Sequence, residues 1–334
     1  MRLSILTLCA VLLVLGCIPD VGQSEHVQVL SYGPNGYEAE SVALPLTSLR
    51  PLETRDIRVF FGGELSFMGG PQVREEAEPL QARVERAADG SLVPTDYLTL
   101  LALCVIHHLD ASSEYIAELD VPGIEHNPPY DVFLHPQVSS AQLGDFTDNM
   151  AYVRGANWFL VAPENDIDAL PLACNRAVVA HEFAHALSFH SDPTPRFPSG
   201  DVVAIDEGFA DIVGAGVTGS ATGARESFRD GSRDLNVARV DEITLSPHER
   251  GAVLASLFWA YRGALISESM PVADANAAMV RLALVTLLTF RDETSPLMSE
   301  FVLRAIELAP EPALLCQRAP LAFPSEEVAL ACAN

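Results

Sequence analysis

The chain has 334 residues, of which 49% are hydrophobic and 19% are charged, a balance typical of a folded globular protein and not of a disordered one. The formal net charge is −25, which argues against nucleic acid as a partner because both molecules would be strongly negative. The sequence contains no lysine, which excludes a Walker-type phosphate loop and Schiff-base chemistry.

The first residues predict an export signal. Arg2 begins it, and the apolar run 3–15 that follows is shorter than a membrane-spanning helix requires. The run ends in the sequence VLGC, which resembles the signal of a bacterial lipoprotein, whose cysteine carries the lipid. We therefore expect residues 1–16 to be a signal peptide and Cys17 to be lipidated. This lipid would be the chain's only membrane contact, and ordinary secretion is the alternative.

Four cysteines remain beyond Cys9 and Cys17. An even number in an exported chain suggests two disulfides. The short loop between Cys316 and Cys332 favours that pair, which leaves Cys104 and Cys174 to bond to each other. The spacings do not fit a cysteine zinc site, and free buried thiols are the alternative. The expected pairs are Cys316–Cys332 and Cys104–Cys174.

Residues 17–95 are expected to form a tether followed by a β-rich portion. Residues 27–30 and 57–61 have the composition of strands, and the glycine-rich stretch 62–70 is typical of a turn or loop. This part of the chain carries no recognisable chemistry.

A helix is predicted to begin after Asp96. Apolar residues follow the helical period as far as Ile106, and His107 and His108 are expected to end the helix. Adjacent histidines point in different directions on a helix, so we interpret this pair as solvent-exposed or helix-end residues and not as metal ligands.

Two lobes follow in the predicted organisation. Residues 96–200 contain the apolar stretches 131–134 and 158–161, which predict strands. From Asn175 onward the chain is expected to be mainly helical, and residues 201–334 form a helical second lobe.

The segment HEFAH matches the pattern HExxH. Residues four apart lie on one face of a helix, so His181 and His185 can reach one metal ion. Glu182 lies beside them and can take a proton from a water that the metal activates. Asn175 is a candidate cap for this helix. The alternative is an ordinary helix that carries two surface histidines.

A catalytic zinc needs a third protein ligand and an open position. His190 would suit the metzincin pattern HExxHxxGxxH, but that pattern requires Gly at 188 and His at 191, where this chain has serines. Glu207 and Asp211 are spaced to share one face of a helix. Glu207 can complete the metal site, and Asp211 can accept a hydrogen bond from a ligand imidazole.

The order HExxH and then ExxxD resembles the gluzincin peptidases, including the thermolysin and fungalysin families. The resemblance covers roughly residues 130–262. It implies an α+β fold, with a zincin-type catalytic domain between a β-rich N-terminal portion and a mainly helical C-terminal lobe. It also implies one catalytic Zn²⁺ held by His181, His185 and Glu207. A surface acidic helix is the alternative interpretation of the second motif.

A third element is a strong helix start. Ser246 can cap, Pro247 suits the first position, and Glu249 can close a capping box, which places His248 in the first turn. The segment resembles the HxxG stretch of fungalysin-type enzymes. That resemblance implies that His248 donates a hydrogen bond to the oxyanion of the reaction. A capping-turn histidine without a catalytic role is the alternative.

In thermolysin-like enzymes an Asn-Ala pair on an edge strand binds the substrate backbone. The corresponding candidates in this chain are Asn149 and Ala151, which are separated by one residue. The family also uses a tyrosine shortly after HExxH, whereas this chain has none between Tyr152 and Tyr261. Oxyanion support is therefore expected from His248 alone or from a further group.

These features predict an exported zinc metallopeptidase that acts on a peptide or protein substrate, with Glu182 as general base. Two alternatives stay open. One is a catalytically silent zincin-fold surface lipoprotein that acts as a binding module, and the other is a zinc hydrolase of a non-peptide amide.

Overall fold

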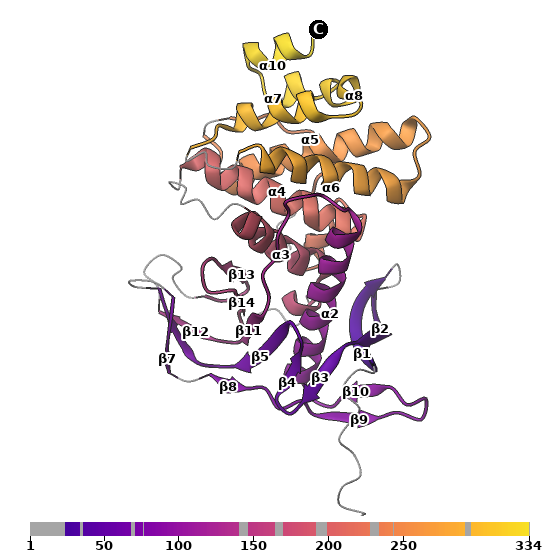
Figure 1. Ribbon diagram of the computed structural model, residues 1–334, viewed down its shortest axis with the longest axis vertical. Coiled ribbons are helices and arrows are strands. Elements are labelled where there is room, and N and C mark those ends of the chain that lie inside the picture. Colours follow the sequence, from indigo (N-terminus) through magenta and orange to yellow (C-terminus); the bar gives the residue numbers. More distant parts are fainter. Residues whose placement is uncertain are drawn as a thin grey trace, which may run out of the picture.

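Figure 1 shows the computed structural model of the chain. It describes residues 24–33, 36–67, 71–75, 77–139, 146–163, 170–191, 199–227, 234–242, 244–290 and 295–333. Strands make up most of the first part and helices most of the second, so the expected α+β class with a β-rich N-terminal portion is confirmed. The predicted signal peptide and Cys17 lie outside the described residues.

Short strands precede the first long helix. They are β1 (Glu25–Gly33), β2 (Gly36–Leu44), β3 (Leu46–Leu49), β4 (Leu52–Thr54), β5 (Ile57–Phe61), β6 (Glu64–Ser66), β7 (Gln72–Glu75), β8 (Glu78–Pro79), β9 (Val84–Arg86) and β10 (Leu92–Pro94). Then come α2 (Tyr97–Glu118), β11 (Tyr130–Leu134), β12 (Gln137–Ser139), β13 (Met150–Val153) and β14 (Trp158–Val161). The helical part contains η1 (Leu172–Cys174), α3 (Arg176–Ser191), α4 (Gly200–Thr218), η2 (Gly223–Glu226), α5 (Pro247–Ser267), α6 (Val272–Leu288), α7 (Met298–Leu308), α8 (Pro312–Cys316), α9 (Ala319–Ala322) and α10 (Glu326–Ala331).

The sheet that matters for the site has the strand order β13-β14-β11-β5-β4-β3, with β8 paired to β5. Strand β11 is parallel to both of its neighbours, and β13 is antiparallel to β14. Strand β13 therefore lies at one edge of this sheet. The strands expected at 57–61, 131–134 and 158–161 are all present. The expected loop at 62–70 was wrong in part, because β6 lies within it and pairs with β7 and β12.

Helix α2 begins where the sequence predicts, with the Asp96 side chain accepting a hydrogen bond from the Thr99 N–H. It does not end at His107 and His108, as expected, but continues to Glu118. The prediction was wrong because His108 is buried and finds a partner far away in sequence. Its Nε2 donates to the Cys174 carbonyl at 3.1 Å. Burial, and the neighbouring His107, lower the pKa of His108 to about 3, so the ring is neutral.

The larger of two hydrophobic clusters among the described residues runs through strands and helices alike, and the smaller one includes Leu65, Phe133 and Leu160. The buried members of the larger cluster extend from Val27 in β1 to Val328 in α10. Figure 1 shows α4, then α5 and α6, then α7 stacked in succession away from the strands. Helix α3 lies at the start of this stack and is buried over most of its surface, which explains why its apolar residues show no one-sided pattern.

Both expected disulfides are present. Cys104 is bonded to Cys174, which joins α2 to the turn before α3, and Cys316 is bonded to Cys332 near the carboxyl end. Disulfides of this kind fit an oxidising compartment outside the cytosol. Within the described ranges, no helix combines the length and the apolar character needed to cross a membrane.

Candidate metal centre

Helix α3 places the HExxH residues. The Asn175 side chain accepts hydrogen bonds from the backbone N–H groups of Ala177 and Val178, so the predicted cap is confirmed. His181 and His185 then lie one turn apart, and their Nε2 atoms are 3.2 Å from each other. The two imidazoles therefore point toward a common location.

Helix α4 supplies the third ligand atom. Ser199 caps this helix, which packs across α3. Gly214 allows a close crossing, because a Cβ at this position would lie 2.9 Å from the Ala177 carbonyl oxygen. The crossing brings Glu207 to the histidines, with its Oε2 3.4 Å from His181 Nε2 and its Oε1 3.8 Å from His185 Nε2.

These three side chains fit a metal ion. Their ligand atoms all lie within 4.8 Å of one another, and no other such group of three or more occurs among the described residues. Bonds of about 2.0–2.2 Å in a tetrahedral site would separate neighbouring ligand atoms by about 3.3–3.6 Å. The two Nε2 atoms are 3.2 Å apart and Glu207 Oε2 is 3.4 Å from His181 Nε2, and both separations are close to this value. Two imidazoles and one carboxylate are also a donor set that zinc accepts while leaving a position open.

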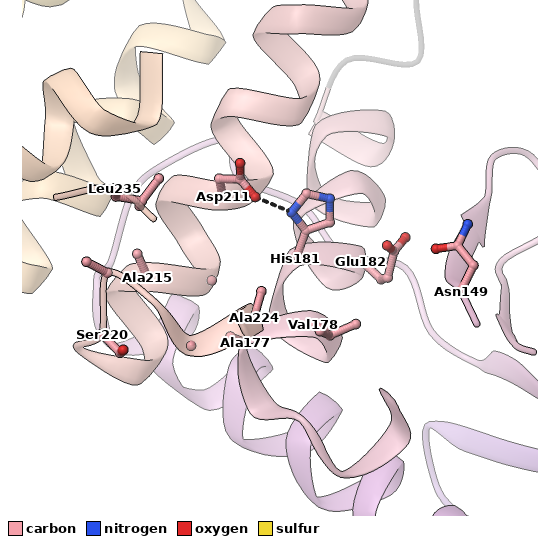
Figure 2. A pocket seen from close by; sticks show the side chains of 13 residues that line it. Asn149, Ala177, Val178, His181, Glu182, Asp211, Ala215, Ser220, Ala224 and Leu235 are labelled. Atoms are coloured by element: carbon pink, nitrogen blue, oxygen red, sulfur yellow. Dashed lines mark hydrogen bonds and ion pairs between the residues drawn. The ribbon is translucent and has the colours of Figure 1, made fainter. Parts of the chain in front are cut away.

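Each histidine is oriented by a carboxylate of α4. Asp211 Oδ1 lies 2.9 Å from His181 Nδ1. Because a carboxylate only accepts, His181 carries its proton on Nδ1, which leaves the Nε2 lone pair available to a metal ion. Figure 2 shows this contact. The predicted role of Asp211 therefore has the required geometry.

Asp206 is a residue that the sequence interpretation missed. Its Oδ2 lies 2.8 Å from His185 Nδ1, in a contact that is close but not aligned as a hydrogen bond. The same carboxylate forms an ion pair with Arg154, which follows β13. Asp206 directly precedes Glu207, and this adjacency was the available signal. Both histidines therefore have an acidic partner.

Two carboxylates beside the histidines carry negative charge that suits a cation. Burial by itself would raise the pKa of Glu207, but its contact with His181 and the proximity of His185 and His248 lower it to about 2. Burial also opposes ionisation of Asp206, and contacts with His185 and Arg154 hold the pKa of that carboxyl below its usual range. Both groups are therefore anions at neutral pH. Glu182 differs, because burial raises the pKa of its carboxyl.

Glu182 is held by the edge strand. The backbone N–H of Tyr152 in β13 donates to Glu182 Oε2 at 2.8 Å. The carboxylate has a second oxygen, and in Figure 2 it lies between His181 and Asn149. A buried carboxylate with a raised pKa beside a metal site is a chemically reasonable proton acceptor.

The backbone of β13 alternates between its two sides. The Ala162 N–H donates to the Asn149 carbonyl, whereas the Tyr152 N–H points away from β14 and toward Glu182. By the alternation of an antiparallel strand, the backbone groups of Ala151 face β14, and those of Met150 and Tyr152 face the open edge. Asn149 and Ala151, the predicted substrate-binding residues, line the cleft at the candidate metal centre, but their backbone groups face β14 and not the open edge. A strand added at this edge would pair with the backbone of their neighbours.

Of the two further candidate histidines, His248 lies beside the metal-binding group and His190 does not. His248 stands in the first turn of α5, after the predicted capping box of Ser246 and Glu249. Its side chain is 63% exposed, and its Nε2 lies 3.4 Å from Glu207 Oε1. His190, the alternative third ligand, instead contacts the Tyr152 hydroxyl at 3.2 Å and does not belong to the metal-binding group.

Two cavities are lined by His181 and Glu182 of the HExxH helix α3. An open cleft of about 340 Å³ is lined by residues 149–152, Arg154, the three ligands and His248. A smaller cavity of about 40 Å³ lies on the other side of His181 and Glu182. Figure 2 shows small apolar side chains around this cavity, among them Ala177, Ala215 and Ala224. The cleft can hold an extended chain, and the cavity has room for a small group only.

A comparison with models of protein families finds no match to this chain, and a search of curated proteins finds no significant similarity.

Proposed function

We propose that this chain is an exported zinc metallopeptidase of the gluzincin type, which hydrolyses peptide bonds in peptide or protein substrates. The observation that carries the proposal is the convergence of His181, His185 and Glu207 beside a buried Glu182 that is held by an edge strand. A zinc ion bound by these three residues would polarise the attacking water and the scissile carbonyl.

Glu182 is the general base in this proposal. Its carboxylate takes the proton of the attacking water and passes it to the leaving amine. The Tyr152 N–H fixes one carboxylate oxygen, and burial raises the pKa of the carboxyl, which favours proton acceptance. His248 lies across the cleft at the start of α5, where its imidazole can donate to the oxyanion.

The edge of β13 orients the substrate. A peptide in extended conformation would pair with this edge through the carbonyl oxygens of Met150 and Tyr152, because their N–H groups already donate to Asn149 Oδ1 and Glu182 Oε2. Such pairing requires an extended backbone and no particular side-chain sequence, so it favours a peptide over a compact non-peptide amide. The cavity of about 40 Å³ beside His181 then accommodates a small side chain next to the scissile bond.

The test is a comparison of Glu182→Gln with the wild-type chain. Glu182→Gln keeps all three ligands, so it should bind one zinc per chain while hydrolysis of a denatured protein falls by at least about a hundredfold. Glu85→Gln, an exposed change on β9, is the matched control and should retain activity. Hydrolysis at the wild-type rate by Glu182→Gln would contradict the mechanism. Peptide binding without turnover by the wild-type chain would instead identify a binding module.

We also propose that the exported chain is anchored through a lipid on Cys17. The support is the sequence before Cys17, together with disulfides that fit an oxidising compartment. Mass spectrometry of the amino-terminal peptide should find an acylated Cys17. A peptide cleaved elsewhere and without an acyl group would indicate ordinary secretion.

A further inference from the structure

A large hollow lies away from the metal ligands, and the proposed hydrolysis makes no use of it. It has a volume of about 490 Å³ and is formed by the segment 235–240, one face of α5 and the residues around α9. This volume falls within the range of about 300–1,000 Å³ that small-molecule sites occupy.

The walls of this hollow are mainly apolar. Val237, Val240 and Leu321 line it and are exposed by 49, 46 and 65% respectively. Trp259 contributes from α5, with its indole N–H donating to Asn236 at 3.1 Å. Large apolar side chains clustered in one exposed hollow are characteristic of a site that binds a ligand or a partner.

The charged residues that line the hollow, among those the structure describes, are both positive. The chain has 45 acidic residues and 20 basic ones, yet the charged lining residues in the described ranges are Arg239 and Arg318. Arg318 is exposed and forms no ion pair with any of the residues that the structure describes. In so acidic a protein, this composition selects for an anionic ligand.

A buried hydroxyl adds a second, independent signal. Ser256 lines the hollow from α5 and is only 8% exposed. Its Oγ has no hydrogen-bond partner among the described residues. A buried polar group without a partner is unfavourable and rare, and this enclosed hydroxyl can bond a polar group in the hollow by turning toward it.

We propose that this hollow binds a small amphiphilic anion, an aliphatic chain that ends in a carboxylate. The apolar wall takes the chain, Arg318 and Arg239 attract the carboxylate, and Ser256 supplies a hydrogen bond. The hollow contains none of the candidate metal ligands, although Leu235 also lines the small cavity beside His181, and the proposal does not rest on the proposed peptidase activity.

Decanoate is the probe. Trp158 and Trp259 are the only tryptophans, so Trp158→Phe leaves Trp259 at the hollow as the sole indole reporter. We expect saturable quenching by decanoate and at least tenfold weaker binding of decanol, which lacks the charge. Calorimetry on the unmodified chain should give the same affinity and guards against a folding defect of the Trp158 variant.

Two variants test the residues. Arg318→Gln should weaken decanoate binding at least fivefold, and Ala260→Phe, which fills the hollow from α5, should abolish it. Arg304→Gln is the matched control, because Arg304 is paired with Glu307 and does not line the hollow. Absence of saturable binding, equal affinity for decanol, or an unchanged affinity in Arg318→Gln would each overturn the proposal.

Discussion

Gly251 offers a direct test of how the third ligand is positioned. This glycine lies on α5 where that helix crosses α4, opposite Glu207 and Gly208. A Cβ at position 251 would lie 2.8 Å from Glu207 Cβ, 2.8 Å from the Gly208 nitrogen and 3.0 Å from the Ala204 carbonyl oxygen. Two of these three atoms belong to the backbone, so a change of rotamer cannot relieve the contact in Gly251→Ala.

The size of the effect follows from these distances. Ordinary carbon contacts are about 3.5–4.0 Å, so α5 and α4 must separate by roughly 0.7 Å. Overpacking of this kind lowers the free energy of unfolding by about 1–3 kcal/mol, and the better helix propensity of alanine offsets about 1 kcal/mol of this loss. Zinc ligand distances tolerate about 0.2 Å, so the shift of Glu207 should weaken zinc binding by roughly 10- to 100-fold.

Competition with a chromophoric chelator measures the zinc affinity, and urea unfolding of the metal-free chain measures stability. Gly263→Ala on the same helix is the control, because a Cβ there has no atom within 4 Å. It should leave zinc affinity unchanged and raise stability by about 0.5–1 kcal/mol. A folded Gly251→Ala chain that binds zinc as tightly as the wild type would refute the reasoning.

Three further predictions concern the orientation of a ligand, buried charge and the disulfides. Asp211→Asn removes the anionic acceptor of the His181 N–H, so zinc affinity should fall at least about tenfold in the same competition assay. The pKa of buried His108 is about 3 against 6.5 unfolded, so protons bind the unfolded chain first and stability is lost as pH falls below 6.5. Between about pH 6.5 and 5, the free energy of unfolding of the metal-free His108→Gln chain should therefore fall by roughly 1.5–2 kcal/mol less than that of the wild type. Urea unfolding measures this difference, and the exposed His26→Gln is the control. Replacing Cys104 and Cys174, which are 70 residues apart, by serine should lower the free energy of unfolding by about 4 kcal/mol. The same change at Cys316 and Cys332, which are 16 residues apart, should lower it by about 3 kcal/mol. Equal losses in urea unfolding would contradict the loop-length argument.

The parts of the site that the sequence predicts are those that depend on local geometry. His181 and His185 share a helix face, as do Glu207 and Asp211, and a face is fixed by spacing alone. The caps at Asn175 and Ser246 are equally local, because a cap depends on the next three residues. That two helices bring these faces together could be inferred only from the resemblance to a family.

The missed contacts depend on how distant segments pack. Asp206 is next to Glu207 on α4, yet its contact with His185 depends on the angle at which α3 crosses α4. Its ion pair with Arg154 joins residues 52 apart. His108 was expected at a helix end because it is polar, and only the Cys174 carbonyl, 66 residues away, explains its burial. None of these pairs leaves a periodic signal in the sequence.

The same contacts indicate which part of the site can move. Residues of the β13 strand and the turn after it contact both sides of the metal centre, since Tyr152 holds Glu182 and Arg154 holds Asp206 beside His185. The proposed base, the candidate ligands and the proposed substrate edge are therefore joined through buried groups, and a buried, multiply bonded unit opens only at a high free-energy cost. His248 is 63% exposed and stands in the first turn of its helix. We therefore expect substrate binding to reposition His248, while the metal ligands and Glu182 keep the arrangement that α3, α4 and β13 give them.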